Sequence, residues 1–514
     1  MKVRRNFLEF RIREKRHESV IGRECALTGF KPSIMVLSRE GIEEIYENAL
    51  YVLSATGIIF KSKRALEILA QAGAEVDHST GVVKFPRDIV KKSVQSCPDS
   101  FTLYYRDGSK ELHVGGDNVY FNPGSAALNF LDSKTHASRR PVSKDFVNFV
   151  RVAEELPNIH AQSTALVCSD VPQEIADRYR LFLVLKYSTK PVITGTFTLD
   201  GTMAMKKMIS LVVGGDEKLA KRPTAIFDCC PSPPLLFSEI TAESLIDCAK
   251  FSIPVELISM PLMGATGPVT IAGSLVQHTA ETLSGIVLAQ TVKRGCPVVY
   301  GGSPSAFDMH YGTTPMGAPE TILIDLAYSQ IGKWLHMPTH TYLGMSDSKL
   351  VDAQAGIESG VSAVLGAMAG INIISGPGML EFENCQSLEK LVIDDEICGM
   401  ALRIAKGFEV NSDTMATEEL LSRGKQGSFI TTPHTLNWFR KEHYFPSEVI
   451  SRANRNQWEK EGSKDIFRRA NERASSLIEK MGSKKALPLN VEQDLDKAML
   501  AELKRFSVNK IPYS

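Results

Sequence analysis

The segment Gly301–Glu320 gathers the side chains best suited to chemistry in this chain. It places a carboxylate, an imidazole and two aromatic rings among glycines and prolines, which interrupt regular structure. An acid and a histidine can hold or move protons, and aromatic faces can bind a cation. We therefore take Asp308 and His310 as catalytic candidates, and Phe307 and Tyr311 as substrate-binding candidates.

A second polar segment, Gly344–Glu358, leads into a predicted helix. Asp347 near a helix start is explained equally well as a cap and as a catalytic acid, because short polar side chains accept hydrogen bonds from free N–H groups. Lys349 and Gln354 are harder to explain as caps. We keep Asp347 as a catalytic candidate and expect Lys349 and Gln354 to bind substrate.

Two more candidates stand at or just after the ends of predicted strands. Asp228 precedes Cys229 and Cys230, but adjacent cysteines chelate one metal poorly and no histidine follows at ligand spacing. We therefore expect Asp228 to line a substrate pocket and expect no bound metal. Phe197 stands in a loop, where a single phenylalanine has less reason to be core, and we expect it to bind substrate as well.

Eight short apolar runs recur from about residue 118, each followed by a loop and an amphipathic stretch. Runs that are apolar throughout are typical of parallel strands covered on both faces. The predicted strands are Val119–Asn122, His160–Leu166, Val192–Thr196, Thr224–Asp228, Val255–Ser259, Val298–Tyr300, Thr339–Leu343 and Ile371–Ser375. The predicted helices are residues 142–155, 173–188, 201–213, 239–251, 270–294, 319–335, 351–369 and 386–409.

Eight strand–helix units favour an α/β fold of the (β/α)₈ TIM barrel type, with extensions at both ends. A doubly wound open sheet uses the same units, but the count of eight and the lack of a glycine fingerprint after the first strand favour the barrel. Both folds place the site at the carboxyl ends of the strands. The long sixth loop, irregular for about 17 residues, is typical of a loop that builds such a site.

The flanking segments differ in character from the repeating units. Residues 1–117 read as helices at 39–55, 61–73 and 86–97 and a hairpin formed by Phe101–Arg106 and Glu111–Val114. Residues 411–514 are polar and helix-rich. We predict three parts: an N-terminal helical and hairpin extension (1–117), a catalytic barrel (118–410) and a C-terminal helical extension (411–514). The extensions would serve as a cap, a barrel plug or an oligomer arm.

Composition excludes several classes of protein. The 59 Lys and Arg balance 59 Asp and Glu, so nothing favours a nucleic-acid partner. No apolar stretch is long and uninterrupted enough to predict a signal peptide or a membrane span. The nine cysteines include no Cys-x-x-Cys, which suits the reducing cytoplasm. Nucleotide-binding glycine motifs and Gly-x-Ser-x-Gly are absent.

The two polar loops resemble those of the trimethylamine methyltransferase family of corrinoid-dependent enzymes. The resemblance is carried by Phe307-Asp308-Met309, by Pro315 to Glu320, and by Gly344–Gly356 with its Ser-Asp-Ser-Lys and Asp-Ala-Gln-Ala-Gly runs. Weaker likenesses are Arg139-Arg140-Pro141 and the segment from His434 to Arg440. The likeness extends from about residue 120 to 445.

This resemblance implies methyl transfer from an amine nitrogen to Co(I) of a cognate corrinoid protein, with no tightly bound cofactor in this chain. Archetypal trimethylamine enzymes contain pyrrolysine, which this sequence lacks, so it resembles the pyrrolysine-free branch that includes glycine betaine methyltransferases. The implied substrate is a quaternary, betaine-like amine. A homo-oligomer is also expected.

In this reading the candidates divide into a cation site and a carboxylate site. Phe197, Phe307 and Tyr311 would cage the ammonium. Lys349 or His310 would bind a substrate carboxylate, and Asp308 would either balance the ammonium or hold its loop. Two other functions fit the same sequence: a metal-dependent barrel hydrolase or lyase using Asp228, His310 and Asp347, or a non-catalytic protein that binds methylated amines.

Overall fold

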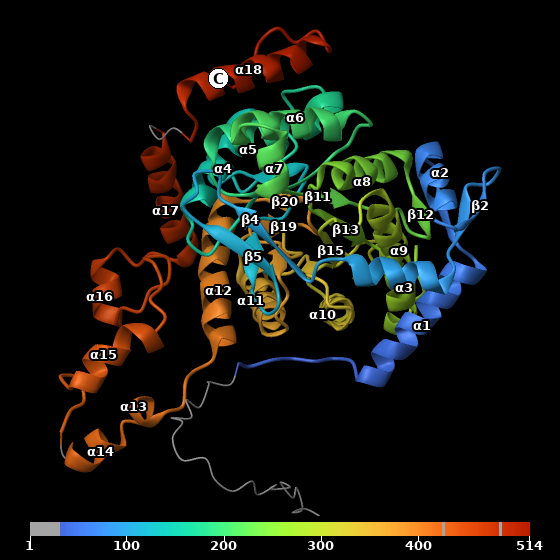
Figure 1. Ribbon diagram of the computed structural model, residues 1–514. Coiled ribbons are helices and arrows are strands. Elements are labelled where there is room, and N and C mark those ends of the chain that lie inside the picture. The colour runs from blue at the N-terminus through green and yellow to red at the C-terminus, as the bar shows by residue number, and fades with distance from the viewer. Residues whose placement is uncertain (1–30, 424–426, 483–485, 514) are drawn as a thin grey trace, which may run out of the picture. The chain divides into compact units, whose positions relative to one another are not determined.

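The computed structural model describes residues 31–423, 427–482 and 486–513 (Figure 1). These residues belong to two compact units: 32–406 with 444–514 form the larger one, and 407–443 with Lys31 belong to the smaller. Every candidate site residue lies in the larger unit. Within the described ranges, no helix has the length and hydrophobicity needed to cross a bilayer.

All eight predicted strands are confirmed. They are β6 (Tyr120–Asn122), β9 (Gln162–Ser163), β10 (Val192–Gly195), β11 (Ala225–Cys229), β13 (Val255–Ser259), β15 (Val298–Gly302), β17 (His340–Thr341) and β18 (Ile373–Ser375). Parallel neighbours follow the orders β9-β10-β11-β13-β15 and β17-β18-β6. A parallel bridge between Tyr300 and Thr339 links β15 to β17, and His160 N donates to Phe121 O (2.7 Å) next to β6 and β9.

The predicted helices between and after these strands are confirmed too. They are α4 (Ser143–Glu155), α5 (Ala176–Tyr187, after the short 3₁₀ turn Gln173–Ile175), α6 (Gly201–Val213), α8 (Glu239–Phe251), α9 (Ile271–Val292), α10 (Pro319–Trp334), α11 (Ala353–Met368) and α12 (Leu388–Lys406). A short α7 (Asp216–Lys221) follows α6. Thr270 caps α9 and Ser238 caps α8, and the side chain of each accepts from the backbone N–H three residues further on.

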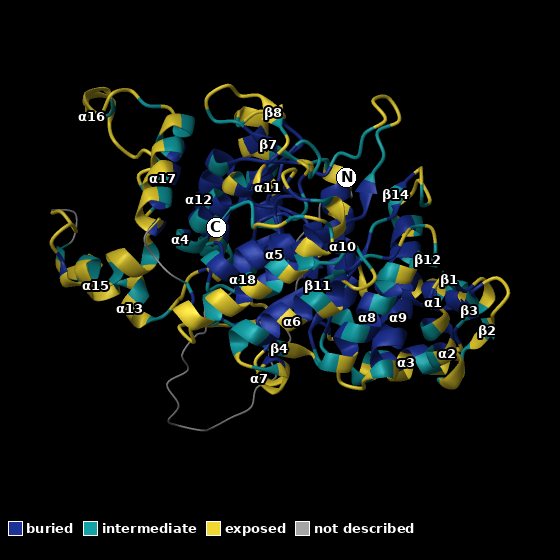
Figure 2. Ribbon diagram, turned by 90° about the horizontal axis from the view of Figure 1, so that it is seen from above, coloured by how far each residue is buried: buried dark blue, intermediate teal, exposed yellow. Residues whose placement is uncertain are grey.

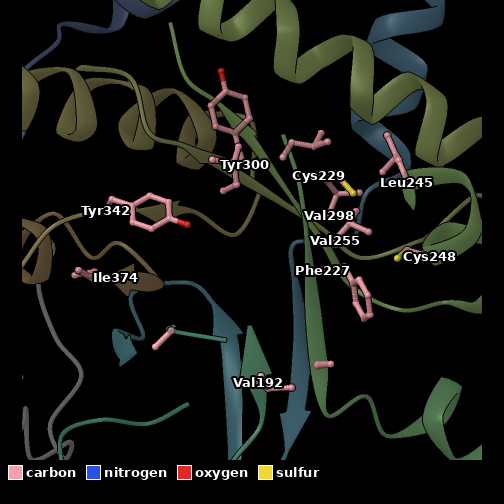
Figure 3. Close-up of a cluster of buried hydrophobic side chains, with 14 of the residues drawn as sticks. Val192, Phe227, Cys229, Leu245, Cys248, Val255, Val298, Tyr300, Tyr342 and Ile374 are labelled. Carbon is pink, nitrogen blue, oxygen red and sulfur yellow. The ribbon is translucent and has the colours of Figure 1, made fainter. Parts of the chain in front are cut away.

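Each strand is buried on two faces, which explains why the runs are apolar throughout. The outward side chains Phe227, Cys229 and Val255 belong to a large core that includes Leu245 and Cys248 of α8 (Figure 3). The residues that alternate with them along the strands, such as Ile226 and Val299, belong to a second core on the opposite face of the strands. Helices α5 and α9 are buried over most of their length (Figure 2).

The loops that follow the strands carry short extra strands. These are β7 (Asn129–Leu131), β8 (Ser138–Arg139), β12 (Leu236–Phe237), β14 (Leu262–Met263), β16 (Ser305–Ala306), β19 (Met379–Leu380) and β20 (Cys385–Gln386). The sixth loop is therefore less irregular than predicted, because β16 pairs in parallel with β14 of the fifth loop. This pairing anchors the base of the loop that carries Phe307.

The N-terminal helices are confirmed as α1 (Arg39–Ala55), α2 (Lys63–Gln71) and α3 (Arg87–Ser96). Between them lie three unpredicted strands, β1 (Ile58–Phe60), β2 (Glu75–Asp77) and β3 (Val82–Lys84), and β1 pairs with β12 of the fourth loop. Strands of three residues leave too short a pattern to detect from sequence.

The predicted hairpin is confirmed as β4 (Ser100–Tyr104) and β5 (Glu111–Gly115). Leu103, Leu112 and Val114 pack with the inward residues of the parallel strands, Ala161, Ile193, Ile226, Val299 and Ile373. Tyr104 N and Arg106 N donate to carbonyl groups just before β11 and β10. The hairpin therefore packs against one face of the parallel strands near their amino ends, which leaves their carboxyl ends for a site.

The C-terminal residues of the larger unit form α16 (Arg455–Lys460), α17 (Ile466–Met481) and α18 (Leu489–Lys504). Apolar residues of α17 and α18, among them Leu477, Leu495 and Met499, join the main core. The polar composition of residues 411–514 would predict solvated helices, but the apolar face of α17 packs into this core. Residues 483–485 lie outside the described part. The smaller unit contains α13 (Ser412–Met415), α14 (Thr417–Arg423) and α15 (Pro433–Glu442).

Candidate active site

Two carboxyl groups lie side by side on the inner face of the parallel strands. Asp228 of β11 and Glu256 of β13 pair in register, so both side chains project to the same face. Burial, and then the charge of the neighbouring Asp228, raise the pKa of Glu256 well above its usual value, so Glu256 is the member of the pair that holds a proton. No described residue donates to Asp228 Oδ1 or to either oxygen of Glu256. Burial raises the pKa of both groups, that of Asp228 to about 6.

A neutral hydrogen-bond chain borders the carboxyl pair. Ser375 Oγ donates to Asn122 Oδ1 (2.8 Å), so it accepts from His340 Nε2 (2.9 Å). Burial lowers the pKa of His340 to about 3, which keeps the ring uncharged although Nε2 lies 3.7 Å from Glu256 Oε1. A Cβ on Gly301 would lie 3.1 Å from His340 Nδ1, and glycine there leaves room for the ring. His340 therefore supplies polarity and no charge.

A third carboxyl, that of Glu383, belongs to the same cluster. Glu383 stands between β19 and β20 in the eighth loop, and burial together with the nearby Asp228 raises its pKa to about 8. Asp228, Cys230 and Glu383 lie deep in the protein and still keep accessible surface. Because these three side chains are only partly buried, we take the space that they border as the candidate ligand site and call it the hollow.

Arg180 of α5 supplies a positive charge beside the hollow. It is fully buried, donates from one NH group to Thr164 O (2.7 Å), and lies close enough to Asp228 to lower the pKa of that carboxyl. Its guanidinium stands over the ring of Phe197 at 4.3 Å. The buried Tyr342 also contributes to the cluster, since its hydroxyl interacts electrostatically with Asp228 and Glu383.

The cluster contains acidic oxygens without hydrogen-bond partners but no recognisable set of metal ligands among the described residues. Among the described residues, no three His, Cys, Asp or Glu side chains are grouped so that they could hold a metal. Asp228, His310 and Asp347, which the metal-dependent alternative needs together, do not form such a group. The carboxyls of Asp228 and Glu256 instead present oxygens without donors, which a cation lacking N–H groups can neutralise.

The structure places the sixth-loop candidates outside this cluster. Asp308 accepts from the backbone N–H groups of His310 (2.8 Å) and Tyr311 (2.9 Å), so it holds its own turn. His310 packs edge-on against Tyr311, which is 77% exposed. Phe307 is half-buried, and its N–H donates to Met263 O (3.3 Å). In this conformation the loop presents His310 and Tyr311 to solvent.

The seventh-loop candidates bind one another and the sixth loop. Asp347 accepts from Met316 N (2.8 Å) and Gly317 N (2.9 Å), which ties the two loops together. Lys349 donates to Asp347 O (2.8 Å) and lies 4.0 Å from the centre of the Phe382 ring. Gln354 bonds to Glu358 on the helix surface. The cap of α11 is Asp352, so Asp347 does not cap this helix.

Of the nine candidates, Asp228 lies in the cluster and Phe197 contacts it through Arg180. Sequence reasoning missed Glu256, His340, Glu383 and Arg180. Glu256 and His340 had a usable signal: each is an ionisable residue inside a run predicted as a buried strand. Arg180 and Glu383 had none, because a charged residue on a helix or in a loop is usually solvated.

A solved structure shares the fold. The crystal structure of the monomethylamine methyltransferase MtmB of Methanosarcina barkeri superimposes with a TM-score of 0.53, covering 88% of this chain and 90% of that one at 11% identity. Fold and site thus define an α/β protein with an acidic hollow at the carboxyl ends of its parallel strands. The sequence model of the trimethylamine methyltransferase (MTTB) family matches residues 10–506, and the chain belongs to this family of methyltransferases.

Curated relatives cover most of this chain. Trimethylamine methyltransferase MttB of Desulfitobacterium hafniense is 32% identical over 442 residues, covering 86% of this chain and 89% of the relative. A glycine betaine methyltransferase of the same species is 30% identical over 432 residues, covering 84% and 89%. The trimethylamine methyltransferase MttB of Methanosarcina thermophila is 32% identical over 461 residues, covering 88% and 94%.

Proposed function

We propose that this enzyme transfers a methyl group from a quaternary, betaine-like amine to Co(I) of a cognate corrinoid protein. The observation that carries the proposal is the Asp228–Glu256 pair, paired in strand register, in which Asp228 Oδ1 and both Glu256 oxygens are buried and accept no hydrogen bond from any described residue. At neutral pH the pair carries a single negative charge. A quaternary ammonium neutralises that charge without requiring directed hydrogen bonds.

The chemistry needs orientation more than acid catalysis. A quaternary nitrogen already carries its positive charge, so the amine leaves as a neutral group and no proton donor is required. The hollow has to exclude water, hold the cation against the acid pair and aim one methyl group outward. The corrinoid, when its own protein presents it, supplies a Co(I) nucleophile that accepts the methyl group.

Arg180 fits the carboxylate of a betaine, because a guanidinium forms charge-assisted hydrogen bonds with a carboxylate. Phe197, which stacks beneath it, keeps the guanidinium in place. Lys349 and His310 remain predicted alternatives for the carboxylate, and Phe307 and Tyr311 remain predicted members of the cage. They would reach the hollow only if the sixth and seventh loops rearranged.

The loops at the carboxyl ends of the strands present exposed apolar side chains that a partner protein could cover. Exposed apolar side chains stand on the loops after β6, β10, β13 and β15, namely Leu128, Phe197, Val269, Met309 and Tyr311. A flat corrinoid and the protein that carries it would cover such side chains. We propose that these loops receive the corrinoid protein in the cytoplasm, where the eight described cysteines, all free thiols, would stay reduced.

The decisive experiment is a methyl-transfer assay with free cob(I)alamin and a panel of quaternary and tertiary amines. We expect methylcobalamin absorbance to grow with at least one quaternary amine, together with its demethylated product. If betaines bind but no methyl group reaches cob(I)alamin or a corrinoid protein, the chain is a non-catalytic binding protein and the proposal is wrong. Stoichiometric zinc or magnesium in active enzyme would favour the hydrolase alternative.

Activity should fall in acid. Burial raises the pKa of Asp228 to about 6, so the pair takes up a second proton as the pH drops through that value and loses its negative charge. We expect this second proton to add about one unit to the slope of log kcat/KM against pH below this point. A profile measured from pH 5 to 8 that stays flat on the acid side would contradict a charge-bearing pair.

We propose that the eight parallel strands close into a (β/α)₈ barrel. Three features support closure: the sequential strand order, the pairing of the first strand β6 with the last strand β18, and the bridge and hydrogen bond that join the two sheets. On this view residues 118–410 form the catalytic barrel. Residues 1–117 supply its plug, and 411–514 form the C-terminal extension.

We also propose a homo-oligomer assembled through the smaller unit. None of α13, α14 and α15 has a buried residue. Large apolar side chains of this unit are exposed, among them Phe408, Val410, Met415, Leu420, Leu421, Phe429, Ile430 and Leu436. Together they expose on the order of 900 Å², about the share that each partner contributes to a standard interface. A surface this apolar suits a permanent contact with a second copy.

Light scattering should therefore report an oligomer for the wild type. The triple variant Leu421→Glu/Ile430→Glu/Leu436→Glu should be monomeric, because each glutamate would be buried without a partner in the interface. Leu489→Glu, an exposed leucine of α18, is the control and should leave the mass unchanged. A monomeric wild type, or a triple variant that keeps the oligomer mass, would contradict the assignment.

A further inference from the structure

The eighth loop holds three consecutive residues in a conformation that L side chains rarely adopt. Glu381, Phe382 and Glu383 have φ values of 54°, 58° and 70°, and none is glycine. The left-handed region brings Cβ too close to the backbone, so single non-glycine residues are uncommon there and three in a row are costly. Strain of this kind persists where surrounding contacts enforce it, and it clusters at functional sites.

Contacts on both sides hold this turn. Glu381 N donates to Ser348 O (3.1 Å) of the seventh loop, and the Lys349 ammonium lies 4.0 Å from the centre of the Phe382 ring. Strands β19 and β20 pair across the turn, with Leu380 opposite Cys385. The turn is therefore clamped to the loop that carries Asp347, and its last residue, Glu383, is directed inward.

Glu383 has no hydrogen bond or ion pair with any described residue, although it lies deep in the protein and lines the hollow. The titratable groups around it are Asp228 of β11, Cys230 after that strand, Tyr342 after β17 and Asp325 of α10, with Glu256 and Arg180 one step further. Its immediate neighbours include no cation. A carboxyl in these surroundings stays protonated until a positive charge arrives.

We propose that Glu383 contacts the quaternary ammonium of the substrate opposite Asp228 and releases its proton to solvent when that cation binds. This rests on the proposed function, because it assumes that the hollow is the amine site. The strained turn then has a purpose: it brings a second carboxylate to a cation that is too wide for the Asp228–Glu256 pair to cover alone. The proton leaves as the cation enters, so the net charge of the hollow is unchanged.

Calorimetry without any corrinoid tests this directly. Tetramethylammonium chloride and glycine betaine would be titrated into the full-length enzyme at pH 7 in phosphate and in imidazole buffer, whose ionisation enthalpies differ. The difference in apparent binding enthalpy gives the number of protons released. We expect the wild type to release between half a proton and one proton per cation bound.

Two variants on the same turn serve as test and matched control. Glu383→Gln keeps the shape of the side chain and should reduce proton release by at least half, with affinity weakened about tenfold. Glu381→Gln, two residues away on the same turn, should release as many protons as the wild type. Unchanged release in Glu383→Gln, or an equal loss in both variants, would overturn the proposal.

The outcome separates this inference from the proposed function. If quaternary amines bind and donate methyl groups while proton release does not depend on Glu383, only the role of Glu383 is lost. If neither ligand binds, both proposals fail. Thermal melts of Glu383→Gln show whether the variant is folded. A second replacement, Glu383→Asp, has a shorter side chain that places the carboxyl further from the cation. It should weaken binding and still release a proton.

Discussion

Removing both members of the acid pair, as Asp228→Asn/Glu256→Gln, is expected to reduce kcat/KM for a quaternary amine by about 10²–10³-fold. Losing an ion–carboxylate contact in a desolvated site costs about 3–4 kcal/mol, and each 1.4 kcal/mol corresponds to tenfold. The two amides can still hydrogen-bond to each other. The hollow should therefore keep its shape and lose only its negative charge.

The single variants should lose much less. In Asp228→Asn the remaining Glu256 can ionise and carry the charge, with the new amide donating to it, and the reverse holds in Glu256→Gln. We expect a loss of about fivefold or less in kcat/KM for each single variant, so the loss in the double variant should exceed the product of the two single losses. Measured kcat/KM values for the four proteins form a double-mutant cycle. Additive effects, or full activity in the double variant, would show that the pair does not act as one charged group.

Truncating Asp347 to alanine should have the largest effect on stability. The change would leave the buried N–H of Met316 and the N–H of Gly317 without a hydrogen-bond acceptor, and it would remove the link between the sixth and seventh loops. Leaving two backbone donors unpaired costs about 2–4 kcal/mol in total. We expect Tm to fall by several degrees, and limited proteolysis to cut first within residues 307–317.

The control for this change lies on the same segment. Gln354→Ala removes an exposed side chain that bonds only to Glu358, and it should change the free energy of unfolding by less than about 0.5 kcal/mol. If Asp347→Ala melts like the wild type and keeps the loop protected, Asp347 does not hold the loops. The catalytic role that its sequence context suggests would then deserve a direct test through kcat.

The order of elements could be predicted because periodicity is a local property. Continuously apolar runs such as Val255–Ser259, each followed by an amphipathic stretch, identify parallel strands and their covering helices without knowledge of the fold. Motif resemblance in the sixth and seventh loops also pointed to the family. Both signals depend only on residues that are neighbours along the chain.

The site was predicted less well, because the residue types of a loop do not reveal which way its side chains point. Asp308, His310 and Lys349 are typical of active-site loops, yet Asp308 closes its own turn and Lys349 binds its own segment. Asp347 joins two loops whose approach no sequence pattern predicts. Loop residues satisfy nearby backbone groups first, and only tertiary packing shows which of them remain available.

The sequence by itself therefore determined the α/β class, the eight strand–helix units, the N-terminal hairpin and the family. Only the tertiary structure decided which charges meet. Asp228 and Glu256 are 28 positions apart and become neighbours through strand register, while Arg180 and Glu383 arrive from a helix and a strained turn. Burial then has an effect that no local sequence pattern reveals: it removes water from these carboxyl groups and raises their pKa values.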